Sequence, residues 1–476
     1  MNASASVATS PRAGIVLAII VASYLMIVVD ISIVITGLPK IQASLGFSAA
    51  QLSWVQNAYT LAFGGLLLLG ARAGDILGRR RMFIAGLSLF TLASVAIGVA
   101  QSVTWLLVAR AIQGVGAAVL APSTLALLST HFAEGPARTR ALSFYAAAAG
   151  VGATLGLVLG GLFADLLSWR AGFFINLPIG LLLIVAASRY IEETPRHTGR
   201  FDLGGAATST LGMAAWVYGL VRASEVGWHD AQALLALGLG LAMTLVFVLI
   251  EQRVAQPVLP LRLLTNRQRN GAYLARMLFL AGMVGFWFFS TQFLQSVLHL
   301  RPFQAGLAFL PVTLPNFASA MAVPYLTRRF GSHALLMAGL LLCIVGLVWL
   351  GQANSHASYW LHVALPMLLI GLGQGVLMAP LTAAGVAGVA HKDTGAASGL
   401  VNVAHQFGGS LGLGVLVLVF ASAAPAPAHD IASLAQRIAT VMDASALMLA
   451  LAGLVAWICI INPHRRGILR QKESLA

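Results

Sequence analysis

The sequence predicts an all-helical membrane protein, and three observations lead to this fold class. The chain has 476 residues, of which 59% are hydrophobic and only 9% charged, whereas soluble domains carry roughly 25% charged residues. Its apolar residues fall in runs of about 20, the length that a helix needs to cross roughly 30 Å of hydrocarbon. Its 28 Lys and Arg gather in alternate loops. We therefore expect a multi-pass protein of the cytoplasmic (inner) membrane.

Fourteen apolar runs qualify as spans. The first begins near Gly14 and ends at Leu38, which is too long for a signal peptide, so we expect it to remain as a span. With the N-terminus in the cytoplasm, 21 Lys and Arg fall inside, five outside and two within spans, and this asymmetry places both termini in the cytoplasm. The expected spans are about 14–38, 50–71, 82–101, 103–129, 141–165, 169–190, 203–222, 231–251, 270–297, 303–325, 332–350, 357–383, 394–420 and 441–461.

Charge and cysteine usage exclude several other classes of protein. The formal net charge of +14 arises from the cytoplasmic loops, so it predicts no nucleic-acid partner. Cys343 and Cys459 both fall inside expected spans, so there is no disulfide framework and no zinc spacing. The chain has no phosphate-binding loop, so we expect it not to hydrolyse ATP. We expect no cofactor, no metal and no enzymatic activity.

An internal repeat divides the chain. The segment Gly78–Leu87 ends in Ile-Ala-Gly-Leu, and Gly331–Leu340 ends in Met-Ala-Gly-Leu at the same distance from its first glycine. Gly114-Val-Gly116 in span four likewise returns as Gly371-Leu-Gly373 in span twelve, each followed by an apolar stretch that ends in Ala-Pro. The repeat predicts two related helical bundles.

The resulting plan is a six-helix bundle over residues 1–202, a two-helix insert over 203–251 and a second six-helix bundle with a cytoplasmic tail over 252–476. Duplicated bundles of this kind bind their substrate near the middle of the bilayer, between halves that rock about it. The expected partners are a small-molecule substrate and the lipid bilayer. The sequence carries no signal for or against a periplasmic adaptor or an oligomer.

Five motifs of the first half are specific in combination. They are Asp30-(eight residues)-Pro39, Trp54-(four residues)-Tyr59, Gly74-Asp75-(two residues)-Gly78-Arg79-Arg80-Arg81, Arg110-(two residues)-Gln113-Gly114-Val-Gly116, and Trp169-Arg170 through Asn176-Leu-Pro178-Ile-Gly180. In this combination the chain resembles the major facilitator superfamily, and within it the fourteen-span drug:proton antiporters. The resemblance implies the major facilitator fold, multidrug or antibiotic efflux, and protons as the coupling ion.

Two positions depart from that family pattern. Ile76 stands where the loop motif usually has a basic residue, and Leu157 follows Gly156 where antiporters usually have proline. Leu157 and the scarcity of buried carboxylates leave an uptake symporter or a uniporter as the alternative within transport. A membrane enzyme or a channel is the rival class. Neither a convergent acid, base and metal set nor a ring of charges supports it.

Asp30 is the only carboxylate well inside an expected span. A charge in hydrocarbon usually serves a transport pathway, a proton relay or an ion pair. Arg110 lies at a similar depth, roughly 10–13 Å from the outer end of its span at 1.5 Å per residue, so the two meet if spans one and four are neighbours. Asp30 then either carries protons under the control of Arg110 or forms a permanent ion pair that only joins two helices.

The loop with Gly74, Asp75, Gly78, Arg79 and Arg80 has two interpretations. It is either a positive-inside anchor or, as the resemblance implies, a conformational latch against a neighbouring helix. The glycines favour the latch because they allow a tight turn around Asp75. We expect Asp75 to cap a helix N-terminus or to pair with an arginine such as Arg138 or Arg140.

Polar and aromatic residues in several spans suggest a substrate cavity. Phe286, Trp287, Phe288 and Phe289 suit flat, apolar or cationic compounds, or else form a lipid-facing strip, and some of the four must face lipid. His405 either relays protons or contacts substrate, or it only bonds across helices. The full candidate set is Tyr59, Gln113, Trp287, Gln292, Gln295, Asn402, His405 and Gln406.

Three further features complete the expectations. Gly152, Gly156 and Gly160 recur every four residues, so they share one helix face and permit close helix packing. Arg276 lies about two turns from the inner end of span nine, where it can snorkel, and we assign it no role. The segment Gly408-Gly-Ser410-Leu-Gly412 fits a hydrolase nucleophile elbow, but it lies in an apolar helix instead of the required strand-to-helix turn.

Overall fold

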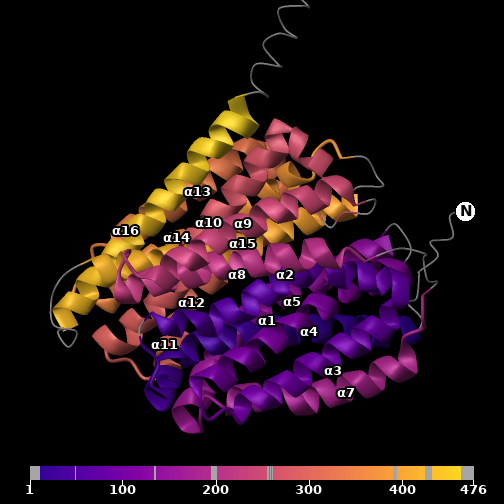
Figure 1. Ribbon diagram of the computed structural model, residues 1–476, viewed down its shortest axis with the longest axis horizontal. Coiled ribbons are helices and arrows are strands. Elements are labelled where there is room, and N and C mark those ends of the chain that lie inside the picture. Colours follow the sequence, from indigo (N-terminus) through magenta and orange to yellow (C-terminus); the bar gives the residue numbers. More distant parts are fainter. Residues whose placement is uncertain are drawn as a thin grey trace, which may run out of the picture.

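The computed structural model describes residues 11–48, 50–132, 136–194, 201–254, 257, 259, 261–389, 394–423 and 431–462. Within this part of the chain every regular element is a helix, so the expected all-helical architecture is confirmed. The two termini, whose cytoplasmic location we predict, lie outside the described residues. Figure 1 shows the helices as two packed sets with a pair of helices across one side.

The first set contains seven helices and forms the lower body in Figure 1. Span six of the prediction is divided into two helices, because Ile175 ends α6 one residue before α7 begins. The helices are α1 (Pro11–Leu45), α2 (Trp54–Leu77), α3 (Arg79–Gly98), α4 (Val103–His131), α5 (Pro136–Leu166), α6 (Ala171–Phe174) and α7 (Asn176–Tyr190).

Most of the second set lies in the upper body of Figure 1, while α11 and α12 lie at its lower left. Its first long helix continues into a π-helical turn, η3 (Phe293–Val297), and short helix α11 precedes α12 within one predicted span. The helices are α10 (Arg267–Gln292), α11 (Pro302–Leu307), α12 (Leu310–Phe330), α13 (Ser332–Leu350), α14 (Leu365–Gly385), α15 (Thr394–Ser422) and α16 (Ile431–Ala456).

Helices α8 (Leu203–Val226) and α9 (Ala231–Arg253) form a hairpin against α2 and α15. Asp230 accepts hydrogen bonds from Arg222 Nε at 3.2 Å and from the Ala233 backbone N–H at 2.9 Å. These bonds, that from Arg222 first, hold the pKa of the Asp230 carboxyl below its usual value. The Asp230 carboxylate therefore caps α9 and ties the turn to α8.

The repeated glycine motifs make the same contacts in both sets. Gly86 of α3 leaves room only for the backbone of α4 at Gly116, whose carbonyl oxygen lies 3.0 Å from an added Cβ. A Cβ added to Gly339 of α13 would likewise lie 2.7 Å from the carbonyl oxygen of Gly373 in α14. The loops before α3 and α13 both turn at a glycine with positive φ, 108° at Gly78 and 81° at Gly331. The sequence repeat is thus also a repeat of helix packing.

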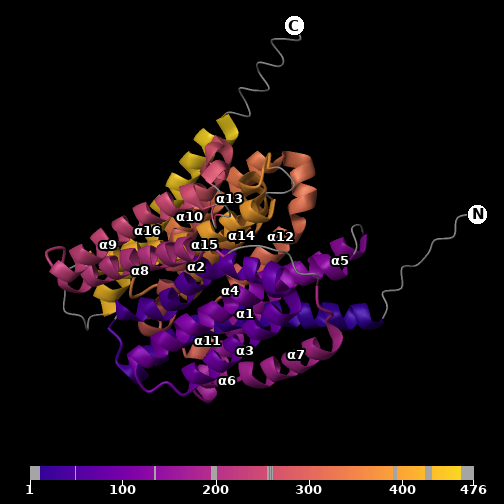
Figure 2. The same ribbon diagram turned by 45° about the vertical axis from the view of Figure 1, so that its right-hand side comes forward.

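The two sets touch along α2–α15 and at one end of α1 and α5. Thr60 and Ser410 share a hydrogen bond of 2.7 Å, and Gln295 Nε2 donates to the Thr36 carbonyl oxygen at 2.8 Å. Gly161 of α5 packs on the backbone of Pro302. Figure 2 shows α5 and α12 spreading apart toward their other ends. The sets are therefore closed together at the end that carries Thr36 and Gln295.

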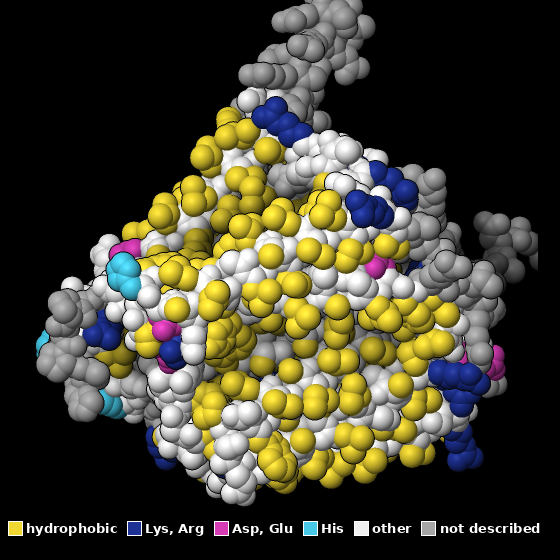
Figure 3. Space-filling model, in the orientation of Figure 1, with side chains coloured by type: hydrophobic (Ala, Val, Ile, Leu, Met, Phe, Trp, Pro, Cys, Tyr) yellow, Lys and Arg dark blue, Asp and Glu magenta, His cyan; other side chains and the backbone are white. Residues whose placement is uncertain are grey.

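Thirteen helical segments of the described chain are long and apolar enough to cross a membrane. The remaining predicted span is α8, a 24-residue helix rich in Gly, Ala, Ser and Thr, so the count of fourteen stays a prediction. In Figure 3 hydrophobic side chains cover the middle of the molecule's face, and most charged ones lie toward its edges. This is the surface that a bilayer requires.

Candidate functional site

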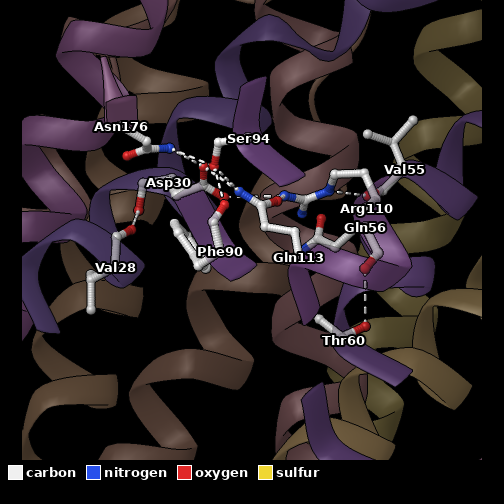
Figure 4. Close-up of polar contacts among 11 residues, drawn as sticks. Val28, Asp30, Val55, Gln56, Thr60, Phe90, Ser94, Arg110, Gln113 and Asn176 are labelled. Carbon is white, nitrogen blue, oxygen red and sulfur yellow. Dashed lines mark hydrogen bonds and ion pairs between the residues drawn. The ribbon is translucent and has the colours of Figure 1, made fainter. Parts of the chain in front are cut away.

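Asp30 and Arg110 meet inside the first helix set. Asp30 is 0% and Arg110 1% exposed, and Arg110 Nη1 donates to Asp30 Oδ2 at 3.1 Å. Asp30 Oδ1 accepts two further bonds, from Gln113 Nε2 at 2.9 Å and Asn176 Nδ2 at 2.7 Å. Figure 4 shows the donors converging on this carboxylate from α4 and α7. The site therefore joins α1 to two neighbouring helices through one acidic group.

A second layer of bonds holds the donors in place. Ser94 Oγ accepts from Gln113 at 2.8 Å and from Asn176 at 3.2 Å, and it donates to the Phe90 carbonyl oxygen. Arg110 Nε donates to the Val55 carbonyl oxygen at 3.0 Å, and Arg110 Nη1 to Gln113 Oε1 at 2.6 Å. These bonds fix the orientations in which Arg110, Gln113 and Asn176 donate to Asp30.

Aromatic rings cover the guanidinium of Arg110. Its Cζ lies 4.5 Å from the ring centroid of Tyr59 and 6.0 Å from that of Phe173, in the geometry of a cation–π contact. A lone charge at the bilayer centre costs about 2.5–3.5 kcal/mol on insertion scales, and the pairing here offsets that cost. A proton that arrives at Asp30 neutralises the acceptor and weakens all three bonds to it.

Asn176 and Ser94 were given no role in the sequence analysis. Asn176 stands in a quoted motif, but its distance of 146 residues from Asp30 hides the contact. Ser94 belongs to no motif. A signal was available, since both are polar residues in apolar spans, where an unsatisfied polar group is expensive.

The glycine-rich loop between α2 and α3 binds the ends of two other helices. Asp75 pairs with Arg79 at 3.1 Å, and Arg79 Nη1 donates to Thr130 Oγ1 of α4 at 2.8 Å. The Gly78 N–H closes α2 by bonding the Gly74 carbonyl oxygen at 3.1 Å. Asp75 thus pairs with an arginine, as one of the two expectations had it, but the partner is Arg79 and not Arg138 or Arg140, because the turn at Gly78 brings the two side chains together.

Glu193, which follows α7, caps the N-terminus of α3. Its carboxylate oxygens accept from the backbone N–H groups of Arg80 at 3.1 Å and Arg81 at 3.2 Å. The Arg80 side chain donates to the Ser188 carbonyl oxygen. The sequence analysis missed Glu193, although a carboxylate at a helix N-terminus is favourable for the free N–H groups and for the helix dipole.

The candidate cavity residues fall into separate groups. Tyr59 and Gln113 belong to the Asp30 site. Gln292 is buried in α10, where its Nε2 has no hydrogen-bond partner among the described residues, and Gln295 bonds α1 across the two sets. Trp287 is half-buried against Phe286 and Phe309, each 5.2 Å away between ring centroids.

The aromatic residues of α10 do not face lipid as expected. Phe286, Phe288 and Phe289 are all 0–1% exposed, and Trp287 is half-buried. The reason is the central position of α10, which packs against α1, α14, α15 and α16. A helix surrounded in this way buries residues that point in several directions.

His405 lies beside Arg276 in the second helix set. Arg276 Nη2 and His405 Nδ1 are 3.2 Å apart, and Arg276 Nη1 donates to Thr382 Oγ1 at 2.8 Å. Arg276 is only 7% exposed, so the expectation that it snorkels to the surface is wrong. Its side chain points sideways to α14 and α15 because both offer polar partners at its own depth.

The remaining candidates, Asn402 and Gln406, are on the same helix, α15. Asn402 is exposed and donates to the Ser398 carbonyl oxygen at 3.2 Å, and Gln406 packs against Gly64 of α2. Ser410 of the elbow-like segment lies within α15 and bonds Thr60.

The three glycines of α5 pack on α1. An added Cβ on Gly152 would meet Val28 at 3.2 Å, on Gly156 the Val29 carbonyl oxygen at 2.7 Å, and on Gly160 the Ile33 backbone at 2.6 Å. Larger residues at these positions would push the helices apart. The glycines therefore let α5 lie directly against the helix that carries Asp30.

No group of three or more His, Cys, Asp or Glu side chains gathers into a metal-binding arrangement within the described ranges. The polar centres instead lie between helices of a chain whose outer surface is apolar. Two helix sets with repeated packing, a buried ionisable site and an apolar exterior define a multi-pass membrane carrier.

The chain belongs to the Major Facilitator Superfamily, whose family model matches residues 20–413. It is 40% identical over 416 residues to the cephamycin export protein CmcT of Amycolatopsis lactamdurans, with 86% of each chain covered. It is 39% identical over 426 residues to the puromycin resistance protein pur8 of Streptomyces alboniger, with 88% of this chain and 84% of that one covered. The protein is thus a multi-pass transporter of the cell membrane.

A solved structure gives the same fold. This is a bacterial homologue of the human lysosomal transporter Spinster in an inward-facing, unoccupied conformation, with a TM-score of 0.70 and 14% identity over 94% of this chain and 97% of that one. The predicted resemblance to the superfamily and its fold is confirmed.

Proposed function

We propose that the protein exports amphipathic small molecules, such as drugs or antibiotics, from the cell in exchange for protons. Relatives that cover most of the chain are named for the export of cephamycin and for resistance to puromycin. The methylenomycin A resistance protein of Streptomyces coelicolor, 29% identical over 454 residues, supports the same class of substrate. Transport, with no enzymatic step and no cofactor, is the whole activity.

The observation that carries this proposal is the buried carboxylate of Asp30 with its three side-chain donors. Asp30 takes up a proton from the outer side, and the loss of charge weakens its bonds to Arg110, Gln113 and Asn176. Deprotonation toward the cytoplasm restores them. One proton moving inward supplies about 2.3 kcal/mol per 100 mV of membrane potential.

Helix α1 connects protonation to the change of access. Thr36, six residues after Asp30, accepts the hydrogen bond from Gln295 that joins the two helix sets. A shift of α1 that breaks this contact opens the end that is closed here, and Asp30 then takes up its proton from that side and releases Arg110. Gly156 and Gly160 allow the shift because they leave backbone against backbone along α5.

The loop from Gly74 to Arg80 acts as the latch in this scheme. Arg79 and Asp75 tie the ends of α2, α3 and α4 together, and Glu193 adds the segment after α7. These helices then move as one body during the rocking motion. The substrate lies between this body and the second set, near Trp287, Gln292 and Gln406.

The experiment is transport in everted membrane vesicles that are acidified inside. We expect wild-type vesicles to accumulate a fluorescent amphipathic drug, and an uncoupler to abolish the accumulation. Asp30→Asn should lose it too, because the amide keeps hydrogen-bonding capacity but takes up no proton, whereas Asp30→Glu should keep part of it. Asp165→Asn, at the end of α5, is the matched control.

Two results would contradict the proposal. Equal, equally pH-dependent transport by Asp30→Asn would remove Asp30 from the coupling. Depletion of the drug from acidified everted vesicles would indicate the alternative, an uptake symporter. Size-exclusion chromatography of each variant shows whether the loss reflects misfolding.

A further inference from the structure

The second helix set holds a buried cation that the scheme above does not use. Arg276 of α10 lies about 14 Å along its helix at 1.5 Å per residue and is 7% exposed. Its guanidinium reaches Thr382 Oγ1 of α14 at 2.8 Å and His405 Nδ1 of α15 at 3.2 Å. Three helices therefore place one charged and two neutral polar groups together.

The contact fixes the state of the imidazole. A guanidinium has only N–H donors, so His405 Nδ1 must accept the bond from Arg276 and carry no proton. The proton of a neutral imidazole then lies on Nε2. His405 consequently leaves the positive charge of Arg276 in place and presents an N–H donor of its own.

Nothing in the described chain neutralises Arg276. No carboxylate oxygen lies within 4.0 Å of it in the residues that the structure describes, and its Nε is buried without a hydrogen-bond partner there. An ionisable group inside a membrane normally pairs with an opposite charge or lies on a substrate path. Because the described residues supply no anion here, the Arg276 guanidinium is available to an anionic ligand.

The cluster has an open edge on the side of the other helix set. Thr382 is exposed, and so is Asn402, one turn before His405 on α15. On the same helix Gly399 packs on Leu68 and Gln406 on Gly64, both of α2. The exposed edge therefore borders the contact between the two sets, where a duplicated carrier binds its substrate.

We propose that Arg276, with Thr382 and His405, is an anion subsite that binds the carboxylate of a transported amphipathic molecule. This inference rests on the proposed export function and names a substrate class for it. A carboxylate matches the planar fork of a guanidinium with two parallel hydrogen bonds. The hydroxyl of Thr382 and the Nε2–H of His405 add donors at its side.

The test is binding of two probes that share one ring system, the anion 1-naphthoate and its uncharged methyl ester. The full chain is placed in phosphatidylcholine nanodiscs at pH 7.5 and titrated calorimetrically with each probe. We expect wild type to bind naphthoate about tenfold or more tightly than the ester, as a charge-assisted bidentate pair allows. Arg276→Gln should lose this preference and keep its affinity for the ester.

Arg267→Gln is the matched control, because Arg267 lies exposed on the same helix and away from the cluster. It should retain the preference. Equal binding of acid and ester by wild type would overturn the proposal without reference to any variant. A preference that survives in Arg276→Gln would overturn it as well.

A second arm distinguishes a transported carboxylate from a lipid phosphate. Nanodiscs that contain phosphatidylglycerol should leave the naphthoate affinity unchanged within about twofold if the subsite receives a solute. Loss of naphthoate binding in those nanodiscs would assign the site to a lipid headgroup and end the proposal. Drug transport by Arg276→Gln distinguishes failure of the anion subsite from failure of the proposed export function. Export of an uncharged drug should persist if only the subsite is lost.

Discussion

Arg110 and Arg276 are both buried arginines at the centre of a helix set, but their partners are opposite in kind. Arg110 has a carboxylate at 3.1 Å and two aromatic rings over its guanidinium. The guanidinium of Arg276 instead bonds the hydroxyl of Thr382 and the imidazole of His405. The first centre is neutral by itself and changes its charge only when a proton binds. The second carries a positive charge with no carboxylate partner among the described residues, so our two proposals place coupling in one half and substrate recognition in the other.

The helices around the two centres do not explain the difference. Gly86 packs on Gly116 in the first set much as Gly339 packs on Gly373 in the second, and a positive-φ glycine opens α3 and α13 alike. The duplicated frame is held by backbone contacts between glycines, which leave the polar positions free to differ. The same helix packing therefore accommodates a buried ion pair in the first set and a buried arginine with neutral partners in the second.

The largest expected effect is on stability. Arg110→Gln leaves Asp30 as an uncompensated buried charge, and breaking such a pair costs about 3–5 kcal/mol. Arg276→Gln removes a charge that has no carboxylate partner, so the free energy of unfolding should change by about 1 kcal/mol or less. Thermal unfolding in detergent micelles measures both.

The double variant Asp30→Asn with Arg110→Gln is the control for this difference. It removes both charges, so it should recover a large part of the stability lost in Arg110→Gln, as replacement of a whole buried pair is often nearly neutral. Equal losses for the two arginine variants would contradict the contrast between the centres.

The glycine contacts should respond alike in the two halves. Valine at position 86 would bring a Cβ to 2.8 Å from the Leu120 backbone nitrogen, and valine at position 339 to 2.7 Å from the Gly373 carbonyl oxygen. Overpacking of this kind costs about 1–3 kcal/mol. We expect Gly86→Val and Gly339→Val to lower the unfolding temperature by similar amounts, and a clear inequality would show that the frames are not equivalent.

Counting residues along helices predicted part of the site. It placed Asp30 and Arg110 at one depth, and the structure shows them in contact. The glycine spacing of α5 indicated one packing face, which lies on α1. Both inferences needed only the rise and the period of a helix, which are fixed by backbone geometry.

Depth alone does not say which way a side chain points or which helix faces it. Arg276 was interpreted as snorkelling for this reason. It lies six residues into the expected span 270–297, whereas His405 lies eleven residues into 394–420, so counting along the spans did not pair them. Asn176 and Glu193 depend on how α7 packs against α3. That arrangement is set by many weak contacts along whole helices, and no local pattern records it.

A substitution at Thr382 can give Arg276 a carboxylate partner like the one that Arg110 has in Asp30. Thr382→Asp places a carboxylate where a hydroxyl now accepts from Arg276 Nη1 at 2.8 Å. The new pair should compete with a bound anion and weaken naphthoate binding about tenfold, or 1.4 kcal/mol. Calorimetry with Thr382→Asn as the uncharged control measures this. Unchanged naphthoate affinity in Thr382→Asp would show that the anion does not reach Arg276.

The smallest effect concerns Glu193, whose carboxylate caps α3. Glu193→Ala should lower the free energy of unfolding by about 1 kcal/mol, the usual value of a helix cap. Arg81→Gln should change it by only a few tenths, about 0.2–0.5 kcal/mol, because its 3.8 Å ion pair with Glu193 is solvent-exposed and such pairs contribute little. If both substitutions had the same cost, the ion pair and not the backbone cap would hold this end of α3.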